Sequence, residues 1–344
     1  MQRQGMARRR MLGGLWMLAV LWSCGAVPEP APSVPLPRPP TLLVGRDNDL
    51  WAMAGVQQPL EQRTALAPSA AAFDPVVAPV GQQLADTYQP PLPTPTPSQA
   101  FVLPQTTIHL ASVSAMAGTA IIPPLPDFDS LDQPAWSPDG ATLYAHYSTL
   151  RFDAQGSVLA SGERIISIDL TTQTTTTLML DAMQPAASPD GRSVAAIRLP
   201  RDSGSQKLIR YDLQHRTEEV LLDDPTVGGL EELIWSADGT AVYLLAIPGP
   251  AGAAPPAPWR WLLADTASAH GAGWQVWRID VATKQVTRLS PQLFDTPSLV
   301  LEGSMVQVWD LNGLWQLDGQ AANQTPTMIR NLGGGGGITL VPHP

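Results

Sequence analysis

An eleven-residue segment occurs three times in this 344-residue chain, and the repeat constrains the fold more than any other feature. The copies are Pro134–Tyr144 (PAWSPDGATLY), Pro185–Ala195 (PAASPDGRSVA) and Leu233–Tyr243 (LIWSADGTAVY), and their glycines lie 51 and 48 residues apart. Periods of this length are typical of propellers and other repeat architectures, in which each repeat is one structural unit.

Each copy predicts a β-hairpin. In Ser137-Pro138-Asp139-Gly140 the residue types suit the four positions of a type I turn, and the glycine is free to take a positive φ. Apolar residues flank the turn on both sides. We interpret the residues of these turns as structural: Trp136, Ser137, Pro138, Asp139 and Gly140; Ser188, Pro189, Asp190 and Gly191; Trp235, Ser236, Asp238 and Gly239.

A second pattern predicts two more strands in every repeat. Ile165–Leu170, Leu208–Leu213 and Val276–Val281 alternate apolar and polar residues, and each is followed by a short polar stretch and another β-rich run. Weaker copies of the first hairpin begin near Val76 and Leu299. A unit of four antiparallel strands and about 50 residues is the size of a β-propeller blade.

The two ends of the repeat region complete each other. Thr41–Arg46 reads as the second strand of a blade that lacks its first, with further strands at Asp49–Ala54 and Gln62–Ala67, and Ile338–Pro344 reads as the missing first strand. We therefore predict an all-β fold over residues 41–344, a six-bladed β-propeller of four-stranded antiparallel blades closed by pairing of the N- and C-terminal strands. Five or seven blades are the alternatives if Phe73–Ile122 or the last unit is misread.

These repeats resemble a known family. Trp-Ser-Pro-Asp-Gly followed by an aliphatic pair and an Ile-x-x-Asp-Leu strand is similar to the WD40-like repeat of TolB and of the propeller domains of prolyl-oligopeptidase relatives. The resemblance implies the propeller fold over nearly all of residues 41–344. It leaves the function open, because propellers host unrelated activities.

The N-terminus predicts export and anchoring. Residues 1–23 have the basic and apolar regions of a signal peptide, and Leu21-Trp22-Ser23-Cys24 resembles the lipobox of bacterial lipoproteins, which implies lipidation of Cys24. An ordinary cleaved signal and twin-arginine export are the alternatives. Residues 24–40 are rich in proline and predict an extended tether. The expected location is the extracytoplasmic side of a membrane, in the periplasm or at the cell surface.

Composition excludes several classes of partner and site. The net charge is −10, so nucleic acid is not an expected partner. The single cysteine excludes a disulfide framework and a zinc site of several thiolates. We find neither a nucleophile elbow nor a phosphate loop, and we expect no catalytic residue, metal or cofactor.

The loops after the second and fourth strands are long, so their face of the ring is the candidate recognition surface. Within it, Trp259, Arg260 and Trp261 form a candidate binding loop. Acidic residues on the same side are interpreted as solvated charges: Asp127, Asp129, Asp132, Asp223, Asp224, Glu231 and Glu232. His146 is interpreted as structural.

The leading hypothesis is a monomeric, membrane-anchored propeller that acts as a protein- or ligand-binding or assembly module at the bacterial cell envelope. One alternative is a propeller enzyme, a hydrolase or lyase acting on glycans or lactones, which carboxylates of raised pKa converging on the ring axis would favour. Another is an extracytoplasmic sensor domain.

Overall fold

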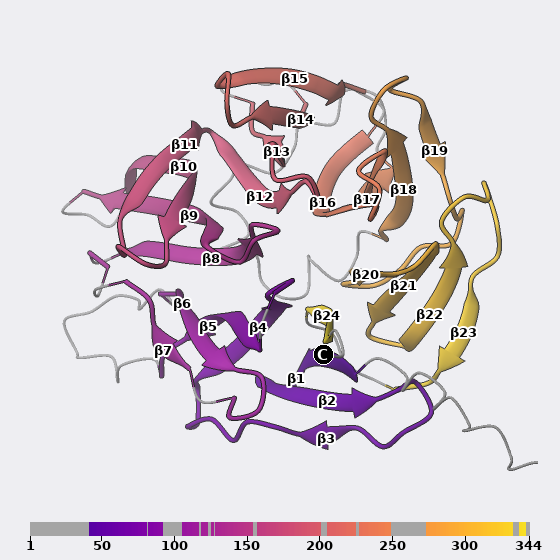
Figure 1. The fold of residues 1–344 in the computed structure, drawn as a ribbon, viewed down its shortest axis with the longest axis horizontal. Helices are drawn as coiled ribbons and strands as arrows, with labels where there is room; N and C mark the ends of the chain where they lie inside the picture. Colours follow the sequence, from indigo (N-terminus) through magenta and orange to yellow (C-terminus); the bar gives the residue numbers. More distant parts are fainter. Residues whose placement is uncertain are drawn as a thin grey trace, which may run out of the picture. The chain divides into compact units, whose positions relative to one another are not determined.

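The computed structural model describes residues 41–341 except 81, 92–104, 117, 123–124, 127, 154–156, 201–204, 225–226, 249–272 and 333–336. Six antiparallel sheets of four strands each are arranged in a ring (Figure 1). The predicted fold class and the predicted number of blades are therefore confirmed. No helix long and apolar enough to cross a membrane occurs among the residues described.

In each blade the strands follow one another from the ring axis to the rim (Figure 1). Blade 1 consists of β24 (Ile338–Val341), β1 (Thr41–Arg46), β2 (Asp49–Ala54) and β3 (Glu61–Gln62). Blade 2 consists of β4 (Ala71–Val77), β5 (Gln83–Gln89), β6 (Thr107–Ser112) and β7 (Thr119–Ala120). Blade 3 consists of β8 (Asp129–Trp136), β9 (Thr142–Phe152), β10 (Val158–Asp169) and β11 (Thr175–Leu180). Blade 4 consists of β12 (Ala182–Ala187), β13 (Ser193–Arg198), β14 (Lys207–Asp212) and β15 (Thr217–Leu222). Blade 5 consists of β16 (Val227–Trp235), β17 (Ala241–Pro248), β18 (Gln275–Asp280) and β19 (Val286–Arg288). Blade 6 consists of β20 (Ser298–Glu302), β21 (Met305–Asp310), β22 (Gly313–Asp318) and β23 (Thr327–Arg330).

The ring closes within blade 1, where β24 pairs antiparallel with β1 from Thr41↔Val341 to Val44↔Ile338. The amide of Gly45 extends the pairing by donating to the carbonyl of Gly337 at 2.8 Å. Gly337 has no room for a side chain, because a Cβ there would lie 2.6 Å from the Cα of Asp74 in blade 2. The predicted closure by the two chain ends is confirmed.

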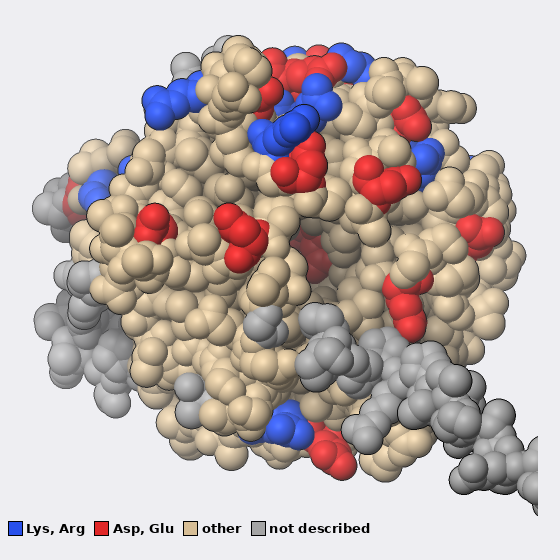
Figure 2. All heavy atoms as spheres, viewed as in Figure 1, with Lys and Arg blue, Asp and Glu red and all other residues tan. Residues whose placement is uncertain are grey.

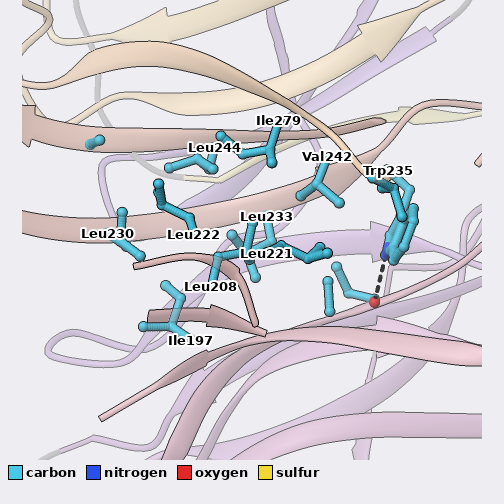
Figure 3. Packing of buried hydrophobic residues seen from close by; sticks show 14 of the residues in the cluster. Ile197, Leu208, Leu221, Leu222, Leu230, Leu233, Trp235, Val242, Leu244 and Ile279 are labelled. Carbon is cyan, nitrogen blue, oxygen red and sulfur yellow. Dashed lines mark hydrogen bonds between the residues drawn. The ribbon is translucent and has the colours of Figure 1, made fainter. Parts of the chain in front are cut away.

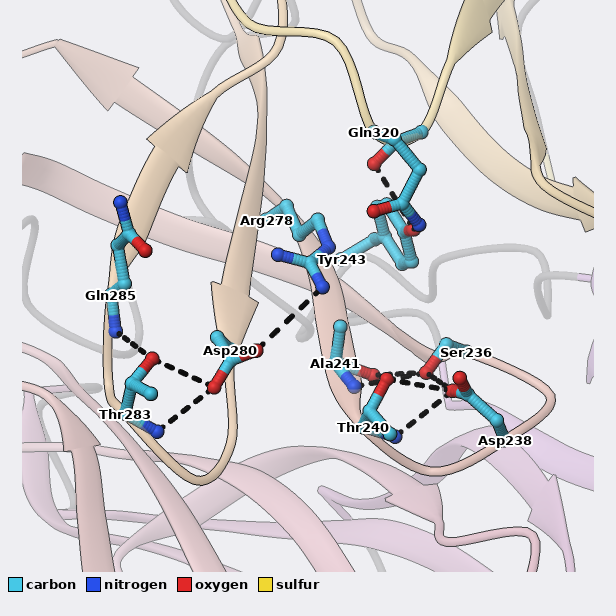
Figure 4. Close-up of polar contacts among 11 residues, drawn as sticks. Ser236, Asp238, Thr240, Ala241, Tyr243, Arg278, Asp280, Thr283, Gln285 and Gln320 are labelled. Carbon is cyan, nitrogen blue, oxygen red and sulfur yellow. Dashed lines mark hydrogen bonds and ion pairs between the residues drawn. The ribbon is translucent and has the colours of Figure 1, made fainter.

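The repeated turns have one geometry. In the first, the amide of Gly140 donates to the carbonyl of Ser137 at 2.9 Å, and Gly140 takes a φ of +71° that favours glycine. The Ser137 hydroxyl donates to Asp139 Oδ1 at 2.6 Å and accepts from the amide of Thr142 at 2.9 Å. The same bonds recur around Ser188 and Ser236, the latter drawn in Figure 4.

Neighbouring blades bury their apolar faces against each other. The core between blades 4 and 5 contains Leu208, Leu233 and Leu244 (Figure 3). The indole of Trp235 donates to the carbonyl of Ala186 on the preceding blade at 3.0 Å, and Trp136 makes the equivalent bond to Val76. Burial of each large aliphatic side chain contributes roughly 1.5–3 kcal/mol, so the stability of a blade comes largely from its neighbours.

The turns after the first and third strands lie on the same side of the ring. In blade 3 the amide of Leu170 donates to the carbonyl of Ala141 at 3.1 Å, and in blade 4 the amide of Leu213 donates to that of Arg192 at 2.9 Å. We call this side the short-turn face. The loops after the second and fourth strands lie on the other side, the long-loop face.

Blade 1 departs from the prediction at its outer edge. The last strand was expected at Gln62–Ala67, but β3 ends at Gln62. Asp49 Oδ1 accepts hydrogen bonds from the Thr64 hydroxyl at 2.7 Å and from the amide of Leu66 at 3.0 Å. Because these bonds hold the segment at the start of β2, the segment does not continue the ladder.

Closure by β24 predicts a large effect of a short deletion. Removal of residues 338–344 deletes β24 and leaves β1 as an open edge, so we expect the melting temperature to fall by at least about 10 °C. Removal of residues 342–344 keeps β24 and serves as the control. Thermal unfolding followed by circular dichroism measures both, and equal melting temperatures for the two deletions would refute the role of β24.

Candidate functional site in the central channel

The innermost strands are acidic. Across β4, β8, β12, β16, β20 and β24 there are six carboxylates and no Lys, Arg or His. The carboxylates belong to Asp74, Asp129, Asp132, Glu231, Glu232 and Glu302. Figure 2 shows acidic atoms deep in the hollow at the centre of the ring. The charged side chains that the innermost strands themselves contribute are therefore all acidic.

A left-handed residue recurs at one level of the inner strands. The φ values are +49° at Asp74, +52° at Gln133, +56° at Gln184 and +43° at Glu232, and each residue lies at a β-bulge. Thr296, just before β20, has a φ of +50°. A non-glycine residue in this conformation costs about 1–2 kcal/mol, and bulges re-aim side chains near functional sites.

Two of these side chains bind the next blade. Gln133 Oε1 accepts from the amide of Gln184 at 3.0 Å, and Glu232 Oε2 accepts from the amide of Leu299 at 2.6 Å. The amide of Gln133 in turn donates to the Thr87 hydroxyl at 3.2 Å. The bulges thus connect blade 3 to blades 2 and 4, and blade 5 to blade 6.

Asp74, Glu231 and Glu232 form what we call the channel acid cluster. Asp74 lies in blade 2 and the two glutamates in blade 5, on opposite sides of the ring (Figure 1). Burial raises the pKa of Asp74 to about 7, with a contribution from the charge of Asp132. Burial and the charge of Asp74 raise the pKa of Glu231 to about 7. The charge of Asp74 thus acts on the carboxyl group of Glu231 across the ring.

Glu232 has the highest pKa of the cluster. Burial raises its pKa to about 8, hydrogen bonds from Ser298 and Leu299 oppose the rise, and the charges of Asp74 and Glu231 add to it. All three side chains keep partial contact with solvent. The raised pKa values place the ionisation of these carboxyl groups near neutral pH, and a cation beside them would favour the ionised form.

A second polar group lies in blade 3, next to the cluster. His146 Nδ1 lies 2.7 Å from Asp132 Oδ1, its Nε2 lies 2.7 Å from Glu163 Oε2, and all three residues are buried. Burial by itself lowers the pKa of His146, but the charges and hydrogen bonds of the two carboxylates outweigh this and raise it to about 10. His146 is thus an imidazolium that donates from both nitrogens and holds β8, β9 and β10 together.

The interpretation of the acidic residues as solvated charges is wrong for Glu231 and Glu232, whose pKa values are raised by burial, and for Asp129 and Asp132. Asp129 is 2% exposed and Asp132 is 5% exposed. Asp129 accepts from the hydroxyl of Tyr147 at 2.6 Å and from Arg151 at 2.5 Å. These carboxylates lie on an inner strand rather than on a loop, and their partners offset the cost of desolvation. Asp127 lies outside the described residues.

The turn residues predicted from the repeat lie on the short-turn face, and the structure brings none of them to the channel acid cluster. A pocket between the turns of blades 4 and 5 is lined in part by Ser188, Pro189, Asp190, Trp235 and Asp238. Cys24 and the loop residues Trp259, Arg260 and Trp261 lie outside the described residues. Among the residues that are described, no group of three or more His, Cys, Asp or Glu is arranged to hold a metal ion.

Sequence reasoning noticed Glu231 and Glu232 only as surface charges and missed Asp74. A signal for Asp74 was present, since Asp74-Pro75 occupies the position of Gln133-Pro134 and Gln184-Pro185 in the repeat. When the weaker copy near Val76 is aligned by Pro75 with Pro134 and Pro185 of the other copies, all three copies have a polar residue just before the proline, at the position of the bulge.

Comparisons with known proteins identify the fold. The sequence matches no protein-family model. It also has no significant match among curated proteins. The structure is similar to TolB from Acinetobacter baumannii, with 17% identity and a TM-score of 0.51 over 84% of this chain and 66% of TolB. The chain thus spans about two thirds of the length of that protein, and the propeller is TolB-like in fold.

Two further solved structures are similar at lower scores. A putative TolB from Agrobacterium tumefaciens has 17% identity and a TM-score of 0.49, covering 73% of this chain and 79% of its own. An oligogalacturonate lyase in complex with manganese has 17% identity and a TM-score of 0.42, covering 71% of this chain and 61% of its own. At 17% identity, the similarity to TolB from Acinetobacter baumannii shows a shared fold and no shared activity.

The buried histidine predicts a pH-dependent contribution to stability. In His146→Gln the two carboxylates lose their cation, so we expect a loss of about 3 kcal/mol at pH 6. Because the folded-state pKa of about 10 exceeds the unfolded value of 6.5, the contribution of His146 is complete below pH 6.5 and declines as the pH rises towards 10. Urea unfolding of both proteins between pH 6 and 10 measures this. A difference that stays constant over that range would contradict the assignment.

Proposed function

We propose that this protein is an exported binding module whose central channel receives a cationic group of a partner. One observation carries the proposal: the innermost strands provide carboxylates from opposite blades and no basic side chain to neutralise them. Structural ion networks place a cation beside buried carboxylates, as His146 does in blade 3. The channel acid cluster has no such partner among the described residues.

The expected ligand is a lysine or arginine side chain in an exposed segment of another protein. A cation that enters the channel stabilises the ionised carboxylates, so binding releases protons and strengthens as the pH rises from 6 to 8. A side-chain cation suits these carboxylates, which are not arranged as metal ligands among the described residues. The TolB-like fold is consistent with a binding role.

The second candidate is the propeller enzyme, which carboxylates of raised pKa at the ring axis were expected to favour, and Asp74, Glu231 and Glu232 are such carboxylates. With pKa values of about 7 for Asp74 and about 8 for Glu232, the two groups titrate near neutral pH, as general acids and bases do. The enzyme proposed on this basis is a hydrolase or lyase acting on glycans or lactones. A sensor domain would use the same cluster to detect a cationic ligand.

Replacement of the cluster by amides tests the binding role. We expect the variant with Asp74→Asn, Glu231→Gln and Glu232→Gln to bind a synthetic Arg/Lys-containing peptide at least tenfold more weakly than the unmodified chain, because the attraction is lost while the side-chain shapes remain. Glu61→Gln, an exposed change on β3, is the control. Titration calorimetry at pH 6 and pH 8 measures both affinity and proton release.

Three results of this experiment are decisive. Equal affinities for the cluster variant and the control would refute the channel as the binding site. An affinity that is independent of pH would refute the participation of the titrating carboxylates. Turnover of a glycan or lactone that disappears in the cluster variant would establish the enzyme in place of the binding module.

The location is the second part of the proposal. Residues 1–23 as a signal peptide, Cys24 as the lipidated residue and residues 24–40 as a tether would hold the propeller on the extracytoplasmic side of a membrane. We expect Cys24→Ser to abolish incorporation of labelled palmitate and to move the protein from the membrane to the soluble fraction. A Ser23→Ala variant, which keeps the cysteine, is the control, and membrane retention of Cys24→Ser would exclude the lipid anchor.

The loop residues Trp259, Arg260 and Trp261 remain proposed contacts of a partner on the long-loop face. Deletion of residues 248–273 tests them separately from the channel, since the channel acid cluster is left intact.

A further inference from the structure

The outer edge of blade 3 differs from the edges of the other blades. β9 and β10 have 11 and 12 residues, whereas the outermost strand β11 has 6. β11 pairs with β10 only from Arg164 to Ile168, because the chain turns at Asp181 with a φ of +51° and enters β12. Among the described residues, the first part of β10, Val158–Gly162, therefore has a neighbouring strand on the β9 side alone.

Backbone groups face the open side of this segment. The carbonyl of Glu163 accepts from the amide of Asp181 at 2.7 Å, so the backbone of Glu163 faces the β11 side. Alternate residues of a strand direct their backbone groups to the same side, so the N–H and C=O of Ser161 also face outward. No described residue bonds to them there, and residues 158–161 are exposed.

This edge has a β-bulge between Val158 and Ala160, but it lacks the short length, the charge and the proline by which natural sheets also protect open strands. The other outermost strands are two residues long (β3 and β7) or carry charged side chains (Glu218 and Glu219 of β15, Arg288 of β19, Arg330 of β23). In contrast, Val158–Gly162 and β11 have no charged residue and no proline. Leu159 is 68% exposed and Leu180, the last residue of β11, is 56% exposed.

We propose that the open edge of β10 binds an extended, uncharged peptide segment of a partner protein, which adds a strand in line with β11. The backbone of Ser161 supplies the hydrogen bonds. Leu159 and Leu180 favour apolar side chains at alternate positions of the peptide. This surface is separate from the channel acid cluster and has no part in the proposed cation binding.

The size of the edge favours a peptide over a second copy of the chain. Five residues of strand span about 17 Å at 3.4 Å per residue. A stable dimer of folded proteins buries about 1,600 Å² in total, far more than one short strand pair provides. The edge therefore fits a single flexible peptide segment, which we expect it to bind with low affinity.

A peptide of the sequence TTTLML, identical to β11, is the probe, because β11 already pairs with β10. With the full chain, we expect the peptide to slow amide hydrogen exchange at Ser161. Ser161→Pro should weaken binding at least tenfold, because proline has no N–H to donate on the open side. Ser161→Ala keeps the N–H and is the matched control, and fluorescence anisotropy of the labelled peptide measures the affinities.

Leu159→Lys gives an independent test that leaves the backbone groups in place. We expect it to weaken binding at least tenfold by placing a charge beside the edge, while Glu61→Gln, an exposed change on β3, binds the peptide as the unmodified chain does. Absence of protection at Ser161, or equal binding by Ser161→Pro, Leu159→Lys and the unmodified chain, would overturn the proposal. So would protection of Ser161 in the free chain together with concentration-dependent sedimentation, which would make a second copy the occupant.

Discussion

The pairing of β24 with β1 is the contact on which the rest of the structure depends. A single four-stranded sheet of this size has two apolar faces and is stable only when both are covered. Each blade covers one face of the next, as Leu208 and Leu244 do between blades 4 and 5, and the bonds of Trp136 and Trp235 tie the inner strands together. Without β24, blade 1 would lose its innermost strand and blades 2 and 6 would each lose part of a neighbour.

Closure also determines the chemistry of the axis. Once the ring is sealed, the middle of each innermost strand faces the channel, where no apolar core is available. The bulges at Asp74 and Glu232 adopt a costly backbone conformation at this level, and carboxylates of opposite blades are brought within range of mutual repulsion. Protonation relieves this repulsion, as the raised pKa values of Asp74, Glu231 and Glu232 express, and the proposed cationic ligand would relieve it in place of protons.

Blade 3 combines internal rigidity with an open rim. His146 binds Asp132 and Glu163, so the inner part of the long β9 and β10 strands is held by a buried ion network. The outer part, Val158–Gly162, extends past the end of β11 and leaves strand hydrogen-bonding groups exposed. A rigid strand with a free edge loses little conformational entropy when a peptide pairs with it. The axis and the rim thus offer two chemically different surfaces, one for charge and one for backbone pairing.

How much of the structure could be predicted depends on how far apart in the sequence the interacting residues lie. The Ser-Pro-Asp-Gly turns, the strand alternation and the terminal half-blades are local patterns, so the sequence by itself determined the blade, the number of blades and the closure by Thr41–Arg46 and Ile338–Val341. Local patterns failed for β3, because the amides of Arg63 and Thr64 both donate to the carbonyl of Leu50 and the Thr64 side chain bonds Asp49, so the regular pairing ends at Gln62. Only the tertiary structure decided that Asp74 acts on Glu231, 157 positions away in the sequence. It also decided that β10 extends beyond the end of β11. Such contacts depend on the curvature of the closed ring and on the register between strands, which no local sequence pattern encodes.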